Sequence, residues 1–161
     1  MDSHAALLDA MMAYEHGCPQ RVHHFLAVRG FAMAIAQGEG LEPRTRLVLE
    51  AAAITHDIGI RPSLEKYGDA SGPHQELEGP VAARPMLEKL GYPAPIADRV
   101  CRLIGKHHTT TDILGDDHQI LLEADFLVNA LSYSGEAVRD MHDKVFKTAT
   151  GRRLLRTLYM D

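Results

Sequence analysis

The stretch EAAAITHDIG, residues 50–59, places a histidine and an aspartate directly after a run of small apolar residues that favours a buried helix. Adjacent helical side chains point about 100° apart, so His56 and Asp57 can face one point only where the helix ends. We expect Gly59 to end it, because glycine lets the chain turn away sharply. The chain must therefore fold so that something stabilises a polar pair at the end of a buried helix.

Helix-forming residues dominate the rest of the chain, whereas valine and isoleucine occur singly and strand signals are scarce. Residues 59–73, rich in Gly, Pro, Ser and Asp, predict a loop with at most one short turn. Pro80 predicts a break within a later helix, and Thr148 is a candidate N-cap for the last one. The pattern predicts an all-α domain. The expected helices span about residues 4–14, 19–37, 44–56, 74–90, 95–106, 117–131, 135–146 and 149–159.

Composition limits the class of protein. The 161 residues, 45% hydrophobic, suit one domain with a real core. A net charge of −5 argues against general nucleic-acid binding, and no apolar run approaches the roughly 20 residues that cross a bilayer. Because the two cysteines form no CxxC pair and the N-terminus lacks a leader pattern, we expect a cytoplasmic protein.

Four polar residues fall on apolar faces of four expected helices, since residues three, four and seven apart share a face. They are His24, His56, His107 and Asp125. Each histidine taken alone fits a core residue bonded to a backbone carbonyl. Asp125 does not, because an ionised carboxylate in a core is costly unless it is paired, and no lysine or arginine shares its face.

A cation is therefore needed beside Asp125, and three inward histidines together with Asp57 suggest that it is a metal ion. Imidazole and carboxylate ligands together suit first-row divalent metals such as iron, manganese, nickel or zinc. A carboxylate can also bridge two ions, one through each oxygen, which histidine cannot do. Asp57 is the candidate for that bridge.

Taken in order, these residues resemble the HD domain superfamily of metal-dependent phosphohydrolases. RVHHFLAV resembles the family's first ligand motif, and the flanking Arg21 and Val28 select His24 over His23. AAAITHDIG resembles the His-Asp doublet, and LLEADFLVNAL resembles the motif that supplies the last aspartate, Asp125.

The resemblance covers about residues 19–131 and implies an HD-type helical bundle with a metal site in its core. The whole chain, residues 1–161, is then a single HD domain. The helices of residues 135–160 either pack on the core or make an oligomer contact. The basic residues of this segment are either a solvated helix face or a surface for phosphate or a partner.

Two further stretches resemble segments of members that hold two metal ions. PHQELEGPVAARPMLEKLGYP points to His74, with a surface histidine as the alternative. RLIGKHHTTTD points to His107 and to His108, the latter as a ligand or as a solvent-facing neighbour. The resemblance therefore implies a site of about two divalent ions. Its implied ligands are His24, His56, Asp57, His74, His107, His108 and Asp125.

The resemblance implies hydrolysis of a phosphate ester, a nucleotide or another small phosphorylated metabolite, by a metal-activated water. Asp57 is its central catalytic residue. Many members carry a lysine three residues after this aspartate; here that position is Ile60, and Arg61 follows. Arg61, Lys106 and Arg21 are the candidate phosphate contacts, with ordinary surface charges as the alternative.

Two other functions stay open. Some HD-fold proteins with two irons are oxygenases that cleave C–C or C–P bonds, and the implied ligand set is compatible with that chemistry. A metal-stabilised binding module without turnover is the third reading. The expected partner is a small phosphorylated substrate rather than a nucleic acid or a membrane, and self-association is left open.

Overall fold

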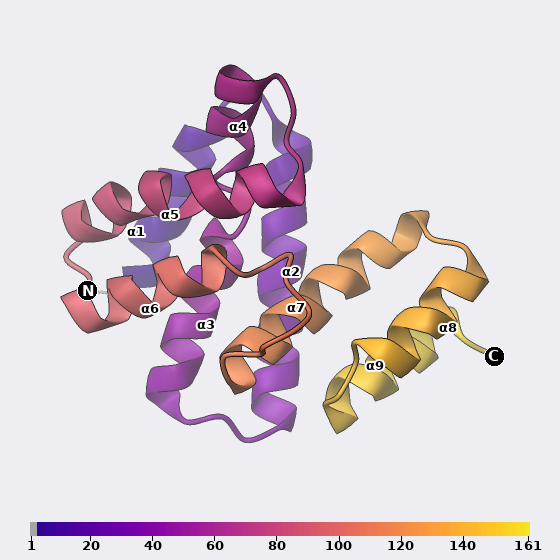
Figure 1. The fold of residues 1–161 in the computed structure, drawn as a ribbon. Coiled ribbons are helices and arrows are strands. Elements are labelled where there is room, and N and C mark those ends of the chain that lie inside the picture. Colours follow the sequence, from indigo (N-terminus) through magenta and orange to yellow (C-terminus); the bar gives the residue numbers. More distant parts are fainter. Residues whose placement is uncertain (1–2) are drawn as a thin grey trace.

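The computed structural model describes residues 3–161, and within them the chain forms helices and no strand (Figure 1). The predicted all-α fold is confirmed. No helix in this part of the chain has the length and apolarity needed to cross a membrane. The helices are α1 (Ser3–Tyr14), α2 (Pro19–Gly38), α3 (Pro43–Thr55), α4 (Ile60–Tyr67), α5 (Gly72–Lys89), α6 (Ala94–Ile104), α7 (Asp116–Asn129), the 3₁₀ turn η1 (Ala130–Ser132), α8 (Gly135–Lys144) and α9 (Ala149–Tyr159).

Helix α3 is the centre of the packing. It contacts α1, α2, α6 and α7, and α2 in turn packs along α7 (Figure 1). The part of a helix that is surrounded in this way must be apolar on every side, and this holds for the end of α3 from Ala51 onward, where small side chains let the neighbouring helices approach closely. Its buried residues are Val48, Leu49, Ala51, Ala52, Ala53, Ile54 and Thr55.

Helix α4 lies where the sequence predicts a loop, so that prediction is wrong for residues 60–67. Pro62 does not prevent the helix, because it falls in the first turn, where backbone N–H groups have no partner within the helix. Gly68 ends it in the left-handed region, with φ +76°, and donates its N–H to the carbonyl of Leu64 at 3.0 Å.

Helix α5 runs unbroken from Gly72 to Lys89, so the predicted break at Pro80 is also wrong. Proline removes one hydrogen bond from a helix, but tertiary packing compensates for that loss here. Helix α5 packs along α6 and against α4. At the α6 contact, a Cβ added to Gly105 would lie 3.3 Å from Cγ of Pro80, so the proline ring rests directly on the neighbouring backbone.

The C-terminal helices pack on the bundle through α9, which contacts α7 and α2 (Figure 1). Thr148 caps α9 as predicted, and its hydroxyl accepts the N–H of Gly151 at 2.9 Å. The fully buried Glu123 of α7 organises this junction. Its carboxylate accepts the backbone N–H groups of Lys147 at 2.6 Å and Thr148 at 2.9 Å, and the hydroxyl of Thr148 at 2.5 Å.

Replacing this carboxylate should loosen the C-terminal helices. We expect Glu123→Ala to lower the free energy of unfolding by about 2–4 kcal/mol, because it leaves several buried donors without an acceptor. Urea denaturation followed by circular dichroism measures the change. The matched control is Glu88→Ala on exposed α5 surface, where the nearest cation, Arg84, is 3.7 Å away; a change within about 0.5 kcal/mol is expected there. Equal effects in the two variants would contradict the assigned role of Glu123.

Candidate metal centre

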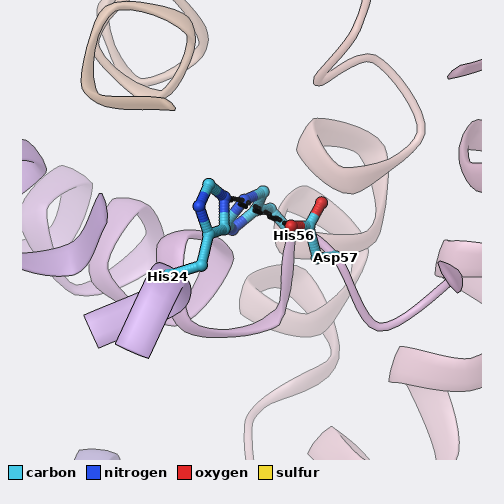
Figure 2. Close-up of side chains that lie close together, drawn as sticks. All are labelled: His24, His56 and Asp57. Carbon is cyan, nitrogen blue, oxygen red and sulfur yellow. Dashed lines mark hydrogen bonds and ion pairs between the residues drawn. The ribbon is translucent and has the colours of Figure 1, made fainter. Parts of the chain in front are cut away.

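Four of the predicted site residues meet in space from three helices and one turn. His24 comes from the middle of α2, Asp125 from α7, and His56 is the C-cap of α3. Asp57 follows in the turn that leads to α4. Figure 2 shows the side chains of His24, His56 and Asp57 directed toward one another. The packing of α2 against both α3 and α7 brings the four together.

The ligand atoms of these residues converge closely. Nε2 of His24 lies 3.2 Å from Nε2 of His56, 3.3 Å from Oδ2 of Asp57 and 3.0 Å from Oδ1 of Asp125. Nε2 of His56 lies 3.3 Å from Asp57 Oδ2 and 3.4 Å from Asp125 Oδ1. Two imidazole nitrogens and two carboxylate oxygens thus surround one point.

The tautomer of His56 follows from its other nitrogen. Nδ1 lies 2.7 Å from the carbonyl oxygen of Ala53, and because a carbonyl only accepts, Nδ1 carries the hydrogen. A neutral His56 therefore presents a lone pair at Nε2 to two carboxylate oxygens, which is repulsive. Either a proton or a metal ion must lie at that position.

His107 repeats this arrangement in the turn after α6. Its Nδ1 donates to the carbonyl of Ile104 at 2.7 Å, again three residues back, so Nε2 is the free nitrogen. That Nε2 is buried, has no hydrogen-bond partner among the described residues, and lies 3.4 Å from Oδ1 of Asp57. The oxygen is the one that does not face His24 and His56. Asp57 therefore links two sets of imidazoles, as expected for a bridging carboxylate.

His108 lies beside His107, with ring centroids 4.0 Å apart. Its Nε2 lies 3.1 Å from Oε1 of Gln75, and its backbone N–H donates to Glu76 at 3.0 Å. Burial, and next the charge of His107, lower the pKa of His108, which favours the neutral, electron-donating form. Ligand atoms of Asp57, His107 and His108 all lie within 4.8 Å of one another.

The structure does not bring His74 into either group of ligands. Its Nδ1 lies 2.7 Å from Oδ1 of Asp69, and its ring stacks on Tyr67 with centroids 3.8 Å apart. Tyr67 in turn donates its hydroxyl to Glu78 at 2.7 Å. His74 therefore belongs to a polar cluster on the surface of α4 and α5, and its metal-binding role stays a prediction.

A pocket of about 320 Å³ opens onto the cluster. Of the predicted phosphate contacts, Arg21 lines it, whereas Lys106 and Arg61 do not. The sequence pattern does not reveal Gln20, Gln75 and Asn129 as lining residues, since a single amide side chain in a helix, exposed or buried, has no periodicity that marks it as part of a pocket. The lining residues are Gln20, Arg21, His24, Asp57, Ile60, Gln75, His108, Asp125 and Asn129.

The imidazoles and carboxylates of the cluster shift each other's pKa values strongly. Burial lowers the pKa of His56, but the carboxylates of Asp57 and Asp125 outweigh it and raise that pKa well above its ordinary range. Burial raises the pKa of Asp57, but His56 and His107 outweigh it and bring it well below normal. The pKa of Asp125 is lowered in the same way by His24 and His56.

The donor set fits a divalent transition metal. The cluster offers imidazole nitrogens and carboxylate oxygens, the ligands that iron, manganese, nickel and zinc accept. His56 and His107 each donate their second nitrogen to a backbone carbonyl, the usual way in which a ligating histidine is oriented. One candidate group is His24, His56 and Asp57, with Asp125 beside it; the other is Asp57, His107 and His108.

The structure explains the glycine at position 59 by close packing, and not by the sharp turn that the sequence predicts there. Its φ of −72° and ψ of −11° are ordinary helical values, so the turn needs no special freedom at this residue. Close packing excludes a side chain instead. A Cβ at Gly59 would lie 2.7 Å from the carbonyl oxygen of Gln75 and 2.8 Å from the backbone nitrogen of Gly79. Helix α5 thus presses directly on the turn that carries Asp57.

A family model for the HD domain matches residues 21–145, most of the chain, and the chain therefore belongs to the HD domain family. The resemblance drawn from the motifs is confirmed. The chain is also similar to the crystal structure of a predicted HD superfamily hydrolase from an uncultured Thermotogales bacterium. The TM-score is 0.68 at 25% identity, over 95% of this chain and 83% of that one. No curated protein matches the chain at a significant level.

The contact between Gly59 and α5 predicts that alanine substitutions at Gly59 and Gly30 change the free energy of unfolding in opposite directions. Gly59→Ala should lower the free energy of unfolding by at least about 1–3 kcal/mol, because backbone atoms must move to admit the methyl group. A methyl group at Gly30 on α2 would meet no atom of the described part of the chain within 4 Å, so Gly30→Ala should stabilise the protein by up to about 1 kcal/mol. Urea denaturation compares them. Stabilisation by both substitutions would show that the turn has room for a side chain.

Proposed function

We propose that this protein is a metal-dependent phosphohydrolase acting on a small phosphate ester. The observation that carries the proposal is the convergence of imidazole nitrogens and carboxylate oxygens around Asp57, where the buried Nε2 of His107 has no hydrogen-bond partner among residues 3–161. Membership of the HD domain family and similarity to a protein described as a hydrolase support it.

The candidate ligands would divide between two ions, with Asp57 as a ligand of both. His24, His56, Asp57 and Asp125 would hold the first, and Asp57, His107 and His108 the second. Iron, manganese, nickel and zinc all suit this ligand set. When bound, such ions polarise a phosphoryl oxygen and make water a stronger nucleophile at neutral pH.

The chain's own residues set the substrate's position. Arg21 lines the pocket beside His24, and a guanidinium forms strong paired hydrogen bonds to phosphate oxygens. The pocket volume of about 320 Å³ suits a small ester. The amides of Gln20 and Asn129 at its wall offer both donors and acceptors to the leaving group. Lys106 and Arg61 do not line the pocket, so we give them no phosphate contact in this proposal.

Metal content tests the division of ligands. After reconstitution with Mn²⁺ and desalting, we expect elemental analysis to find about two ions per chain in the native protein and about one in His107→Ala. His74→Ala is the matched control, and it should keep both ions because His74 bonds to Asp69 instead. Loss of one ion from His74→Ala, with none lost from His107→Ala, would reassign the second site to His74.

Hydrolysis itself is tested with p-nitrophenyl phosphate and the Mn²⁺-loaded protein. Asp57→Asn should lower kcat/KM by at least about a hundredfold, because the amide cannot serve both ions as a charged bridge. Asp143→Asn is the control, since its carboxylate is 77% exposed and lies outside the pocket lining.

Phosphate release by the native protein, lost in Asp57→Asn and kept in the control, is the expected result. If the iron-loaded protein instead consumes oxygen and no phosphate ester is hydrolysed, the oxygenase reading replaces this one. An inactive protein that still binds metal and phosphate would be a binding module.

A further inference from the structure

A buried acid outside the metal centre holds the arginine that lines the pocket. Glu15 follows α1 directly, and its side chain is 1% exposed. Its Oε2 accepts a hydrogen bond from Nη1 of Arg21 at 3.0 Å. The same oxygen lies 4.0 Å from Nη2 of Arg61 on α4. One carboxylate oxygen therefore faces two guanidinium groups, one from each side of the His-Asp doublet in the sequence.

Tyr14 ties the same segment to the turn that carries Asp57. Its hydroxyl donates to the carbonyl of Ile58 at 3.0 Å, and the guanidinium carbon of Arg61 lies 5.3 Å from the centre of its ring. The end of α1 thus contacts the start of α2, the turn after α3, and α4. These contacts hold in place the start of α2, which carries Arg21, and the turn that carries Asp57.

This segment lies outside the region that the HD family model matches, residues 21–145. Nothing in the family match therefore assigns it a role. Burial of a carboxylate is costly unless positive charge balances it, and here the balance comes from Arg21, which lines the pocket. A purely structural acid could be balanced by an arginine anywhere.

We propose that Glu15 is a positioning residue for phosphate recognition: it holds Arg21 at the pocket wall so that the remaining guanidinium N–H groups bind the phosphate of the substrate. The proposal rests on the phosphohydrolase function proposed above. A guanidinium carries five N–H donors, and Glu15 takes one Nη1 donor, so donors remain for the ligand. Glu15 also screens Arg21 from Arg61, which would otherwise repel it.

Binding of inorganic phosphate to the Mn²⁺-loaded protein, measured by isothermal titration calorimetry, tests this role. Glu15→Gln keeps the shape but removes the charge. We expect phosphate to bind about tenfold more weakly and KM for p-nitrophenyl phosphate to rise by the same factor, with kcat within about twofold and metal content unchanged. Glu15→Asp, which keeps the charge, should recover part of the affinity.

The control is Glu50→Gln. Glu50 also holds an arginine, Arg29, at 2.8 Å with its side chain 16% exposed, but neither residue lines the pocket. Phosphate affinity should be unchanged in that variant even where stability falls. A double-mutant cycle adds a second readout: in the Arg21→Gln background, Glu15→Gln should cause no further loss of phosphate affinity.

The outcomes are distinguishable. Unchanged or tighter phosphate binding in Glu15→Gln overturns the positioning role and leaves the proposed function intact. An equal further loss in the Arg21→Gln background also overturns it, since Glu15 would then act independently of Arg21. If the native protein neither binds phosphate nor hydrolyses the ester, the proposed function fails and this inference fails with it.

Discussion

Two largely enclosed carboxylates, Asp57 and Asp125, that share the same pair of histidines govern the architecture of this protein. Asp57 and Asp125 approach the same pair of imidazoles, and each must be balanced by positive charge because neither is well solvated. Backbone carbonyls fix the hydrogen of His56 and His107 on Nδ1, which directs Nε2 toward the carboxylates. The backbone geometry therefore fixes the orientation of these imidazoles, and with it the need for a cation between Nε2 and the carboxylates.

Close packing turns that requirement into a rigid site. The alanines of α3 let α2, α6 and α7 surround it. On the far side of the doublet, Gly59 lets the turn and α5 touch backbone to backbone. Gly79 lets α5 pack closely on α6, since a Cβ at Gly79 would meet Ile104 at 2.5 Å. Asp57 is thus confined between α3 and α5. This confinement keeps the two oxygens of Asp57 facing different imidazoles, Oδ2 toward His24 and His56 and Oδ1 toward His107.

Much of this could be predicted from the sequence because helical periodicity places polar residues on apolar faces. His24, His56 and Asp125 were found in that way, and they do meet. The errors have local causes. The Gly, Pro, Ser and Asp content of residues 59–73 predicts a loop and Pro80 predicts a break, yet Pro62 falls in the first turn of α4 and tertiary packing accommodates Pro80. Other features leave no local signal. The roles of Glu15, Glu123 and Gln75 depend on contacts between distant segments, which periodicity does not reveal.

The treatment of other buried acids distinguishes the metal centre from ordinary core polarity. Glu15 and Asp117 each pair with an arginine, Asp117 through both of its oxygens. Glu123 is satisfied by backbone, hydroxyl and amide donors. Among the described residues, Asp57 and Asp125 are the exceptions, since imidazoles are the only basic groups within 4.0 Å of their oxygens. Other buried acids receive permanent donors from arginine, hydroxyl or backbone groups. Asp57 and Asp125 instead face imidazoles, which are weakly basic and can bind metal ions, and this arrangement favours a cation that can exchange.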